Sequence, residues 1–270
     1  MKLFLLIFLA ALLSACNYQA EVPSYVYIKP FELKTHMATE GSASENILDA
    51  WVYLDDKALG VFQLPARVPI IASGPGKLRF MPGIKKDGIS GIRDVYPFYT
   101  HYSLDFLPHP ATVDTVIPSI SYIDGLNFPL LEDFEIGNDF SNMNRTSIRN
   151  EVFEGNWSGV VRLDAFNNEL ASSSSAFLLP QDGRRIFLEM DYKCSLPFNV
   201  SLLAGKNTGL DPVYAVTITP KDQWNKIYID LTEEVIANKA LDYRLIFSSS
   251  LPAGAEEATY FFDNIKIVHL

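Results

Sequence analysis

Residues 186–194 read IFLEMDYKC, and every second side chain from Ile186 to Tyr192 is apolar. Strict alternation of this kind is the pattern of a β-strand that buries one face. The same period returns at Phe198/Val200/Leu202, Tyr214/Val216/Ile218, Ile227/Ile229/Leu231, Tyr243/Leu245/Phe247 and Phe261/Asp263/Ile265/Ile267. Such closely spaced strands predict a β-sandwich for the second half of the chain, where only residues 232–240 favour a helical turn or two.

The first half also reads as short strands separated by turns. Residues 51–54 and 59–62 flank a turn-like cluster that begins at Asp55, which predicts a hairpin. A further strand is expected over residues 77–81, and the breakers that start at Pro82 are expected to end it.

A domain boundary is expected near residues 123–125, because prolines punctuate residues 108–118 and a new pattern begins at Leu131. The chain is therefore predicted to be all-β, with two β-sandwich domains. The predicted parts are a signal peptide (1–15), a lipidated linker (16–24), a small sandwich (25–124) and a second sandwich (125–270).

Two local resemblances refine these domains. The hairpin, with residues 64–65 and 76–80 after it, resembles the PEGA-like small β-sandwiches of bacterial envelope proteins, which are non-catalytic. Segments 131–135, 156–160 and 261–267 resemble the galactose-binding-like jelly roll of many carbohydrate-binding modules. The resemblances imply a small Ig/PEGA-like sandwich followed by a jelly-roll sandwich.

The jelly-roll resemblance also implies that the first and last strands are neighbours, which would bring Glu135 close to Asp263. Two adjacent carboxylates need a cation or a proton. A structural Ca²⁺ held by Glu135 and Asp263 is one interpretation, and capping of turns by the same residues is the other. No other cofactor is predicted.

The N-terminus has the form of an export signal. Lys2 precedes an apolar run over residues 3–13, which is too short for a mature membrane span, and small residues follow. Residues 13–16 resemble the bacterial lipobox, which implies cleavage and acylation at Cys16. The alternative is an ordinary secreted protein with a chance cysteine. Asn17 is not the aspartate that retains enteric lipoproteins in the inner membrane, so an outer-membrane location is expected.

The whole chain resembles a family of Bacteroidota outer-membrane lipoproteins to which no catalytic residues are assigned. The segments that carry this resemblance are 41–44, 49–53, 62–65, 83–89 and 96–99. It implies an envelope role. Residues 19–21 resemble the export signals that send Bacteroidota lipoproteins to the cell surface, which implies that the chain faces the cell exterior. Residues 114–116 further resemble the acceptor of Bacteroidota O-glycosylation, which would modify Thr115.

Composition excludes some partners and sites. The net charge of −10 argues against nucleic acid, which binds to clustered positive charge. With Cys16 acylated, Cys194 has no cysteine partner, and its setting favours a buried structural thiol.

The sequence shows no catalytic constellation. None of the four histidines forms a metal-binding pair at helical spacing, and no nucleophile elbow or phosphate loop is present. A carboxylate-dependent, glycan-active enzyme could use residues such as Asp164 and Glu189, but nothing in the sequence pairs them. We therefore expect a protein that is not an enzyme.

Two binding functions remain. The first is a scaffold subunit of an envelope protein complex, such as outer-membrane assembly or transport machinery, which would bind its partner through Tyr96, Phe98, Tyr99 and Tyr102. Packing between the two domains is the other role for these aromatics. The second function is glycan binding by the jelly roll, with Trp157 and Trp224 as stacking candidates or as packing residues.

The lipobox assignment gives a direct prediction. Replacing Cys16 by Ala should release the protein from the membrane, because acyl chains at this residue would be its anchor. Membrane fractionation followed by immunoblotting measures this. A variant that stays in the outer-membrane fraction after washing would refute lipidation as the sole tether.

Overall fold

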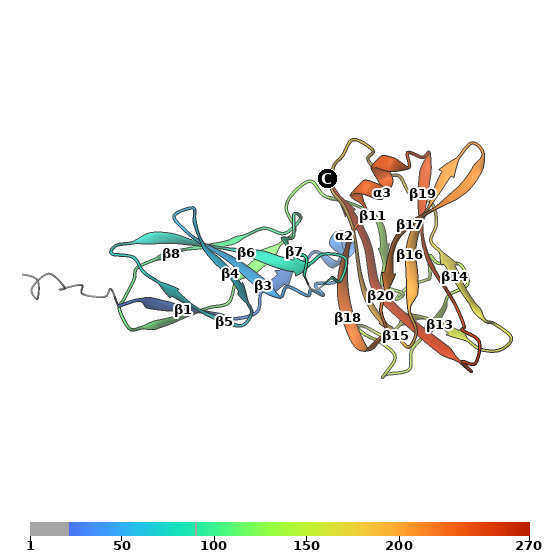
Figure 1. Ribbon diagram of the computed structural model, residues 1–270, viewed down its shortest axis with the longest axis horizontal. Helices are drawn as coiled ribbons and strands as arrows, with labels where there is room; N and C mark the ends of the chain where they lie inside the picture. Colours follow the sequence, from blue (N-terminus) through green and yellow to red (C-terminus); the bar gives the residue numbers. More distant parts are fainter. Residues whose placement is uncertain (1–21, 90) are drawn as a thin grey trace, which may run out of the picture.

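The computed structural model describes residues 22–89 and 91–270, so Cys16 lies outside the described part of the chain. The all-β prediction is confirmed: two β-sandwich units follow one another, and the N-terminal unit meets the C-terminal unit end-on (Figure 1). The described residues form two short helices, α2 (Met37–Glu40) and α3 (Thr232–Ala237). Neither is long and apolar enough to cross a membrane.

Strands β1 to β10 form the N-terminal sandwich. One layer holds the sheets β5-β1-β9 and β10-β2, and the other has the order β4-β3-β6-β7, with β8 also paired to β6. Alternate side chains such as Ile28, Val68 and Phe80 meet in the core between the layers. The strands are β1 (Ser24–Ile28), β2 (Glu32–Lys34), β3 (Asp49–Leu54), β4 (Lys57–Gln63), β5 (Ala66–Ile70), β6 (Gly76–Lys85), β7 (Arg93–Val95), β8 (Tyr102–Phe106), β9 (Val113–Val116) and β10 (Ser119–Ser121).

The predicted hairpin is confirmed as β3 and β4, which are joined by Asp55 and Asp56. Both residues have positive φ, 46° and 66°. A two-residue type I′ turn requires this backbone conformation at both positions, and aspartate tolerates it better than most residues.

The strand predicted for residues 77–81 is longer than expected, because β6 continues through Pro82 to Lys85. β6 pairs with β8 as far as Phe80 and with β7 from Gly83 onward. Pro82 has no N–H to donate, and it lies where the partner on this side changes. A proline is tolerated at such a gap in the ladder.

Strands β11 to β20 form the C-terminal sandwich. Its first sheet has the order β12-β13-β20-β15-β18, with β11 also paired to β20, and its second sheet has the order β14-β19-β16-β17. Ile186, Leu188 and Met190 on β15 point into the core between the sheets. The strands are β11 (Asn127–Glu132), β12 (Asn144–Thr146), β13 (Ser158–Leu163), β14 (Glu169–Ser173), β15 (Ile186–Cys194), β16 (Phe198–Lys206), β17 (Gly209–Ile218), β18 (Lys221–Asp230), β19 (Asp242–Ser250) and β20 (Ala258–His269).

A β-bulge interrupts the alternation predicted for residues 261–267. The pairing of β20 with β15 shifts register around Asn264, whose φ of 48° is positive. One extra residue moves the side-chain period by one position. Phe262 and Ile265 therefore both point into the core, whereas Phe261 does not, so the single alternating face predicted here is wrong.

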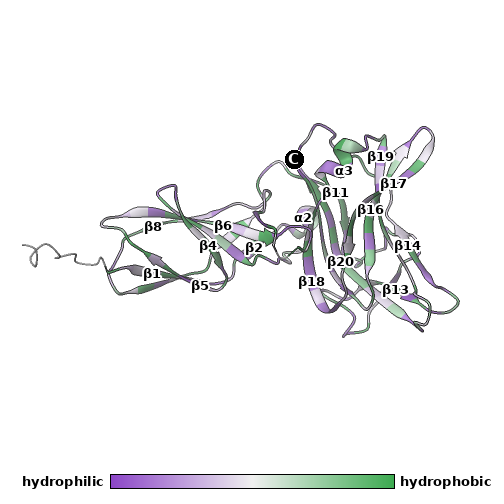
Figure 2. Ribbon diagram, viewed as in Figure 1, coloured by the Kyte–Doolittle hydropathy of each residue, from purple (hydrophilic) through white to green (hydrophobic). Residues whose placement is uncertain are grey.

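The second face of β15 is also buried, because the N-terminal sandwich packs against it (Figure 1). Phe187 belongs to the same hydrophobic core as the N-terminal strands, and Glu189 is 0% exposed. Figure 2 shows strands of both units changing between hydrophobic and hydrophilic colours along their length. In an isolated sandwich the polar face of an antiparallel sheet would be in water. Here it forms the domain junction.

The aromatic run predicted to bind a partner lies inside this junction. Tyr96, Phe98 and Tyr99 are at most 5% exposed, and Tyr102 is half-buried. The Tyr96 ring lies 5.2 Å from the ring of Phe187, which comes from the other domain. Tyr96, Phe98 and Tyr99 are therefore inaccessible to another protein, and the prediction that they bind a partner is wrong. They pack the two domains together.

The carboxylate of Glu189 is held by both domains. The hydroxyls of Tyr96 and Tyr122, from the N-terminal sandwich, donate to its Oε1 at 2.6 and 2.9 Å. Nζ of Lys226, on the neighbouring strand β18, lies 3.5 Å from its Oε2. A buried carboxylate needs such partners, since leaving it unpaired costs several kcal/mol.

Replacing Tyr96 by Phe should lower the free energy of unfolding by about 1.5–3 kcal/mol, the usual value of a hydrogen bond to a charged group. Urea unfolding followed by fluorescence measures the change. Tyr27→Phe is the matched control, because Tyr27 is half-buried and its hydroxyl forms none of the side-chain hydrogen bonds found in the described chain. Equal stability of the two variants would contradict the role given to the bond between Tyr96 and Glu189.

Candidate functional site

Further charged groups are buried next to Glu189 on the same sheet face. Oδ1 of Asp191 accepts a hydrogen bond from Ser44 Oγ at 2.8 Å. Nζ of Lys266 donates to the carbonyl oxygen of Ser42 at 2.6 Å. Burial lowers the pKa of Lys266 to about 8 and raises the pKa of Asp191. The residues around Ser42 and Ser44 therefore belong to the N-terminal sandwich in sequence but complete the polar face of the C-terminal one.

The two carboxylates proposed to hold Ca²⁺ are bound to protein donors instead. Oε1 of Glu135 accepts the backbone N–H groups of Asn156 and Trp157, at 2.8 and 2.9 Å. Oδ2 of Asp263 accepts a hydrogen bond from Ser158 Oγ at 2.5 Å. Among the described residues, no group of three or more His, Cys, Asp or Glu side chains is arranged to hold a metal ion. These contacts favour the turn-capping interpretation.

Both tryptophans proposed to stack on sugars are half-buried and packed against protein. The guanidinium of Arg145 lies 4.4 Å from the ring centroid of Trp157. The Trp224 ring lies 5.3 Å from that of Phe153 and 6.3 Å from that of Phe261. These contacts agree with the packing role.

The carboxylates considered for catalysis do not form a pair. Asp164 is exposed in the turn after β13, where it accepts backbone N–H groups, whereas Glu189 is sealed in the junction. Cys194 is 3% exposed, and burial raises the pKa of its thiol to about 11. A thiol with so high a pKa is a poor nucleophile, which agrees with the structural role expected for it.

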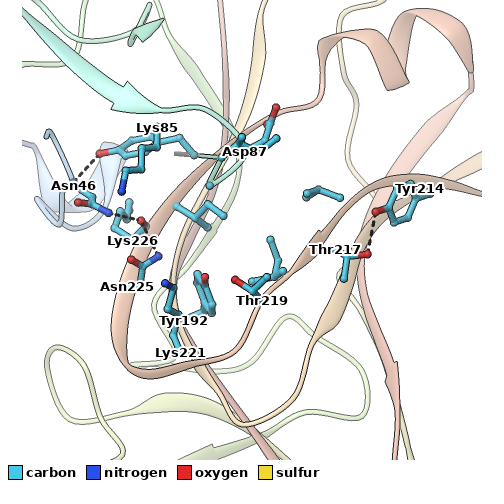
Figure 3. A pocket seen from close by; sticks show the side chains of 16 residues that line it. Asn46, Lys85, Asp87, Tyr192, Tyr214, Thr217, Thr219, Lys221, Asn225 and Lys226 are labelled. Carbon is cyan, nitrogen blue, oxygen red and sulfur yellow. Dashed lines mark hydrogen bonds between the residues drawn. The ribbon is translucent and has the colours of Figure 1, made fainter. Parts of the chain in front are cut away.

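The best-formed candidate site is a cavity of about 330 Å³ beside the junction. Both domains line it: β6 and the loop after it form one wall, and β15, β17 and β18 form the others (Figure 3). Polar side chains dominate where the two domains meet. The lining includes Asn46, Lys85, Tyr192, Thr219, Lys221 and Asn225.

Amide groups from the two domains meet on one backbone carbonyl in this cavity. Nδ2 of Asn46 donates to the carbonyl oxygen of Lys226 at 2.8 Å, and Nδ2 of Asn225 donates to the same oxygen at 3.2 Å. Each primary amide has a second N–H and a carbonyl oxygen beyond this bond. Tyr214 adds an exposed aromatic ring, whereas the ring of Tyr192 is buried in the sandwich core. Burial raises the pKa of the Tyr192 hydroxyl to about 12, so it keeps its proton.

The loop after β6 shapes the wall that faces β18. Asp87 donates its backbone N–H to the carbonyl of Tyr228 at 2.8 Å and accepts the N–H of Asp230 at 2.9 Å. Gly88 has a positive φ of 70°, and a Cβ there would lie 2.9 Å from Cδ1 of Ile227. Glycine at this position lets the loop lie directly on β18, which fixes the width of the cavity.

None of the cavity residues was identified as functional from the sequence. Asn46, Lys85, Tyr192 and Asn225 lie in four separate segments, and each has an ordinary local explanation as a turn or strand residue. The one signal in the sequence is the charge content of residues 83–89, a segment that otherwise contributes only to the resemblance to outer-membrane lipoproteins.

No family model matches the chain, and no curated protein matches its sequence. Among solved structures, a family 29 carbohydrate-binding module complexed with mannohexaose is 14% identical, with a TM-score of 0.35 and coverage of 53% of this chain and 91% of that one. The C-terminal family 22 module of Clostridium thermocellum Xyn10B is 14% identical, with a TM-score of 0.36 and coverage of 53% and 92%.

A longer Clostridium thermocellum structure, the CBM22-1 and GH10 modules of the same xylanase with xylohexaose, is 16% identical, with a TM-score of 0.39. The match covers 53% of this chain and 28% of that one. Identities below 25% and TM-scores below 0.5 make these likenesses too distant to support a conclusion about the ligand. A conclusion about the ligand therefore rests on the chemistry of the cavity.

The buried carboxyl of Asp263 gives a testable pH dependence. Burial raises its pKa from 3.8 to about 7, so between these values the folded state retains a proton that the unfolded state has lost. Its contribution to the free energy of unfolding is therefore fully present below about pH 4 and declines as the pH rises to about 7. Asp263→Asn should remove this decline, as measured by urea unfolding from pH 4 to pH 8.

The exposed Asp105 on β8 provides the matched control, since Asp105→Asn should leave the pH dependence of the wild-type protein unchanged. If Asp263→Asn and the wild-type protein lose stability in parallel over this range, Asp263 does not carry a proton in the folded state.

Proposed function

We propose that this protein is a non-catalytic, glycan-binding lipoprotein of the bacterial envelope, and that the junction cavity holds the glycan. The observation that carries this proposal is the lining of the cavity. It combines amides, hydroxyls and ammonium groups with the exposed ring of Tyr214. Its volume of about 330 Å³ lies at the small end of the range for ligand pockets, about 300–1,000 Å³, and suits a short stretch of sugar.

Sugar recognition explains the mixture of groups. A sugar ring presents hydroxyls that both donate and accept hydrogen bonds, and an amide such as that of Asn225 can do both at once. Its C–H face is apolar and packs on an aromatic ring, as the 60% exposed Tyr214 offers here. A purely apolar ligand would cover the remaining amide groups of Asn46 and Asn225, beyond their bonds to the Lys226 carbonyl, without giving them partners, which is unfavourable.

The same lining argues against hydrolysis of the bound sugar. Glycosidases generally act with two carboxyl groups that flank the scissile bond. Among the described residues that line the cavity, Asp87 is the one carboxylic acid, and its Oδ1 already accepts the N–H of Asp230. A binding function needs no such pair.

The envelope location rests on the N-terminal sequence. The export signal and Cys16 support an acylated N-terminus that tethers the two sandwiches to the outer membrane. A tethered protein samples a thin layer near the membrane, which raises its effective concentration toward polymers and proteins there. The scaffold function loses its specific support, since its proposed contact residues Tyr96, Phe98 and Tyr99 are inside the junction.

A glycan array with the full chain in detergent tests the proposal, followed by calorimetry with the glycan that binds. Asn225→Ala should weaken binding about five- to a hundredfold, because it removes one or two hydrogen bonds to the sugar. Asn46 would still hold the Lys226 carbonyl in this variant, so the fold should persist.

Asn207→Ala is the control, since Asn207 is exposed in the turn between β16 and β17 and should leave affinity unchanged. A blank array, together with recovery of the protein in a stable complex from native membranes, would overturn glycan binding in favour of the scaffold function. Equal affinity of Asn225→Ala and Asn207→Ala would show that the glycan binds elsewhere.

A further inference from the structure

The cavity carries a charge opposite to that of the whole protein. The chain has a net charge of −10, yet the cavity lining contains three lysines, Lys85, Lys221 and Lys226, against the single carboxylate of Asp87. Clefts lined by one sign of charge concentrate ligands of the other sign. The protein itself neutralises some of these charges.

Two of the four charges have protein partners. Nζ of Lys226 is buried and lies 3.5 Å from Glu189 and 3.8 Å from Asp191, so the junction balances it. Asp87 accepts a backbone N–H and interacts favourably with the charges of Lys86 and Arg185 outside the lining. Neither group is left to meet a charged ligand.

Lys85 and Lys221 are different. Neither takes part in any of the salt bridges found among the described residues. Lys85 comes from β6 of the N-terminal sandwich and is half-buried, and Lys221 begins β18 and is exposed. In Figure 3 the two side chains enter from opposite walls, and Asn225 lies between them.

We propose that the glycan held by this cavity is acidic, and that Lys85 and Lys221 bind the negative group of one sugar residue while Asn225 binds its hydroxyls. This inference rests on the glycan-binding function proposed above and adds the class of sugar. A neutral sugar would leave two ammonium groups in the cavity without a counter-charge. An acidic sugar supplies this negative counter-charge, and both lysines are accessible to it.

The test compares matched glycans that differ only in charge. An oligogalacturonide and its fully methyl-esterified form have the same backbone, and a sulfated galactan oligosaccharide with its desulfated form tests sulfate against carboxylate. The full chain in detergent should bind one of the charged forms about three- to tenfold more tightly than its neutral form, because two partly exposed ion pairs act together. The preference should shrink as salt is raised from 0.05 to 0.5 M.

Variants then assign the preference to the two lysines. Lys85→Gln with Lys221→Gln should abolish the preference, so that the charged and neutral forms bind this variant equally. Lys239→Gln, at an exposed lysine near the end of α3, is the charge-matched control and should keep the full preference. Thermal unfolding of each variant verifies that the fold is intact, which the exposure of these side chains favours.

The outcomes separate this inference from the function on which it rests. Equal binding of charged and neutral forms, or a preference that survives in the double variant, overturns the acidic-glycan inference while glycan binding stands. Failure of all four oligosaccharides, with a neutral glycan bound on the array and lost in Asn225→Ala, also overturns it alone. Failure of every glycan overturns both.

Discussion

The structure depends on how the carboxylate of Glu189 is satisfied. Two tyrosine hydroxyls from the N-terminal sandwich donate to its Oε1, one lysine from the C-terminal sandwich forms an ion pair with its Oε2, and the residue is 0% exposed. Removing a charge from water is costly, so this polar cluster by itself adds little stability. The favourable energy of the junction comes from burying rings such as Tyr96 and Phe187. The polar contacts instead select one orientation, because any other docking would leave a buried charge unpaired.

That single orientation is what creates the candidate site. Lys85 and Asn46 come from one domain, and Tyr192 and Asn225 come from the other, so the cavity exists only while the domains are docked. The loop after β6 forms part of the contact between the domains, since Asp87 and Gly88 lie against β18. A ligand that contacts both walls binds the docked state alone and therefore stabilises the junction by an amount that grows with the logarithm of its concentration.

The bulge at Asn264 contributes to the same arrangement. Without the extra residue, β20 would present one continuous alternating face, and Lys266 would point into the apolar core of the C-terminal sandwich. With it, Phe262 and Ile265 both remain in that core. Lys266 lies on the opposite face, where it reaches the carbonyl of Ser42 in the other domain. A register shift of one residue therefore decides whether Lys266 disrupts the core or connects the two domains.

The sequence by itself determined the strands, because alternation along a segment such as 186–194 depends only on which residues avoid water. It also determined the turn at Asp55 and Asp56, whose short polar side chains tolerate positive φ. The fate of the second face of β15 was decided only by tertiary structure. Glu189 and Asp191 look like solvent-facing residues of an ordinary strand, and local sequence carries no record that another domain covers them. The cavity is undetectable in the sequence for the same reason: its residues are distant along the chain, and docking alone brings their polar groups together.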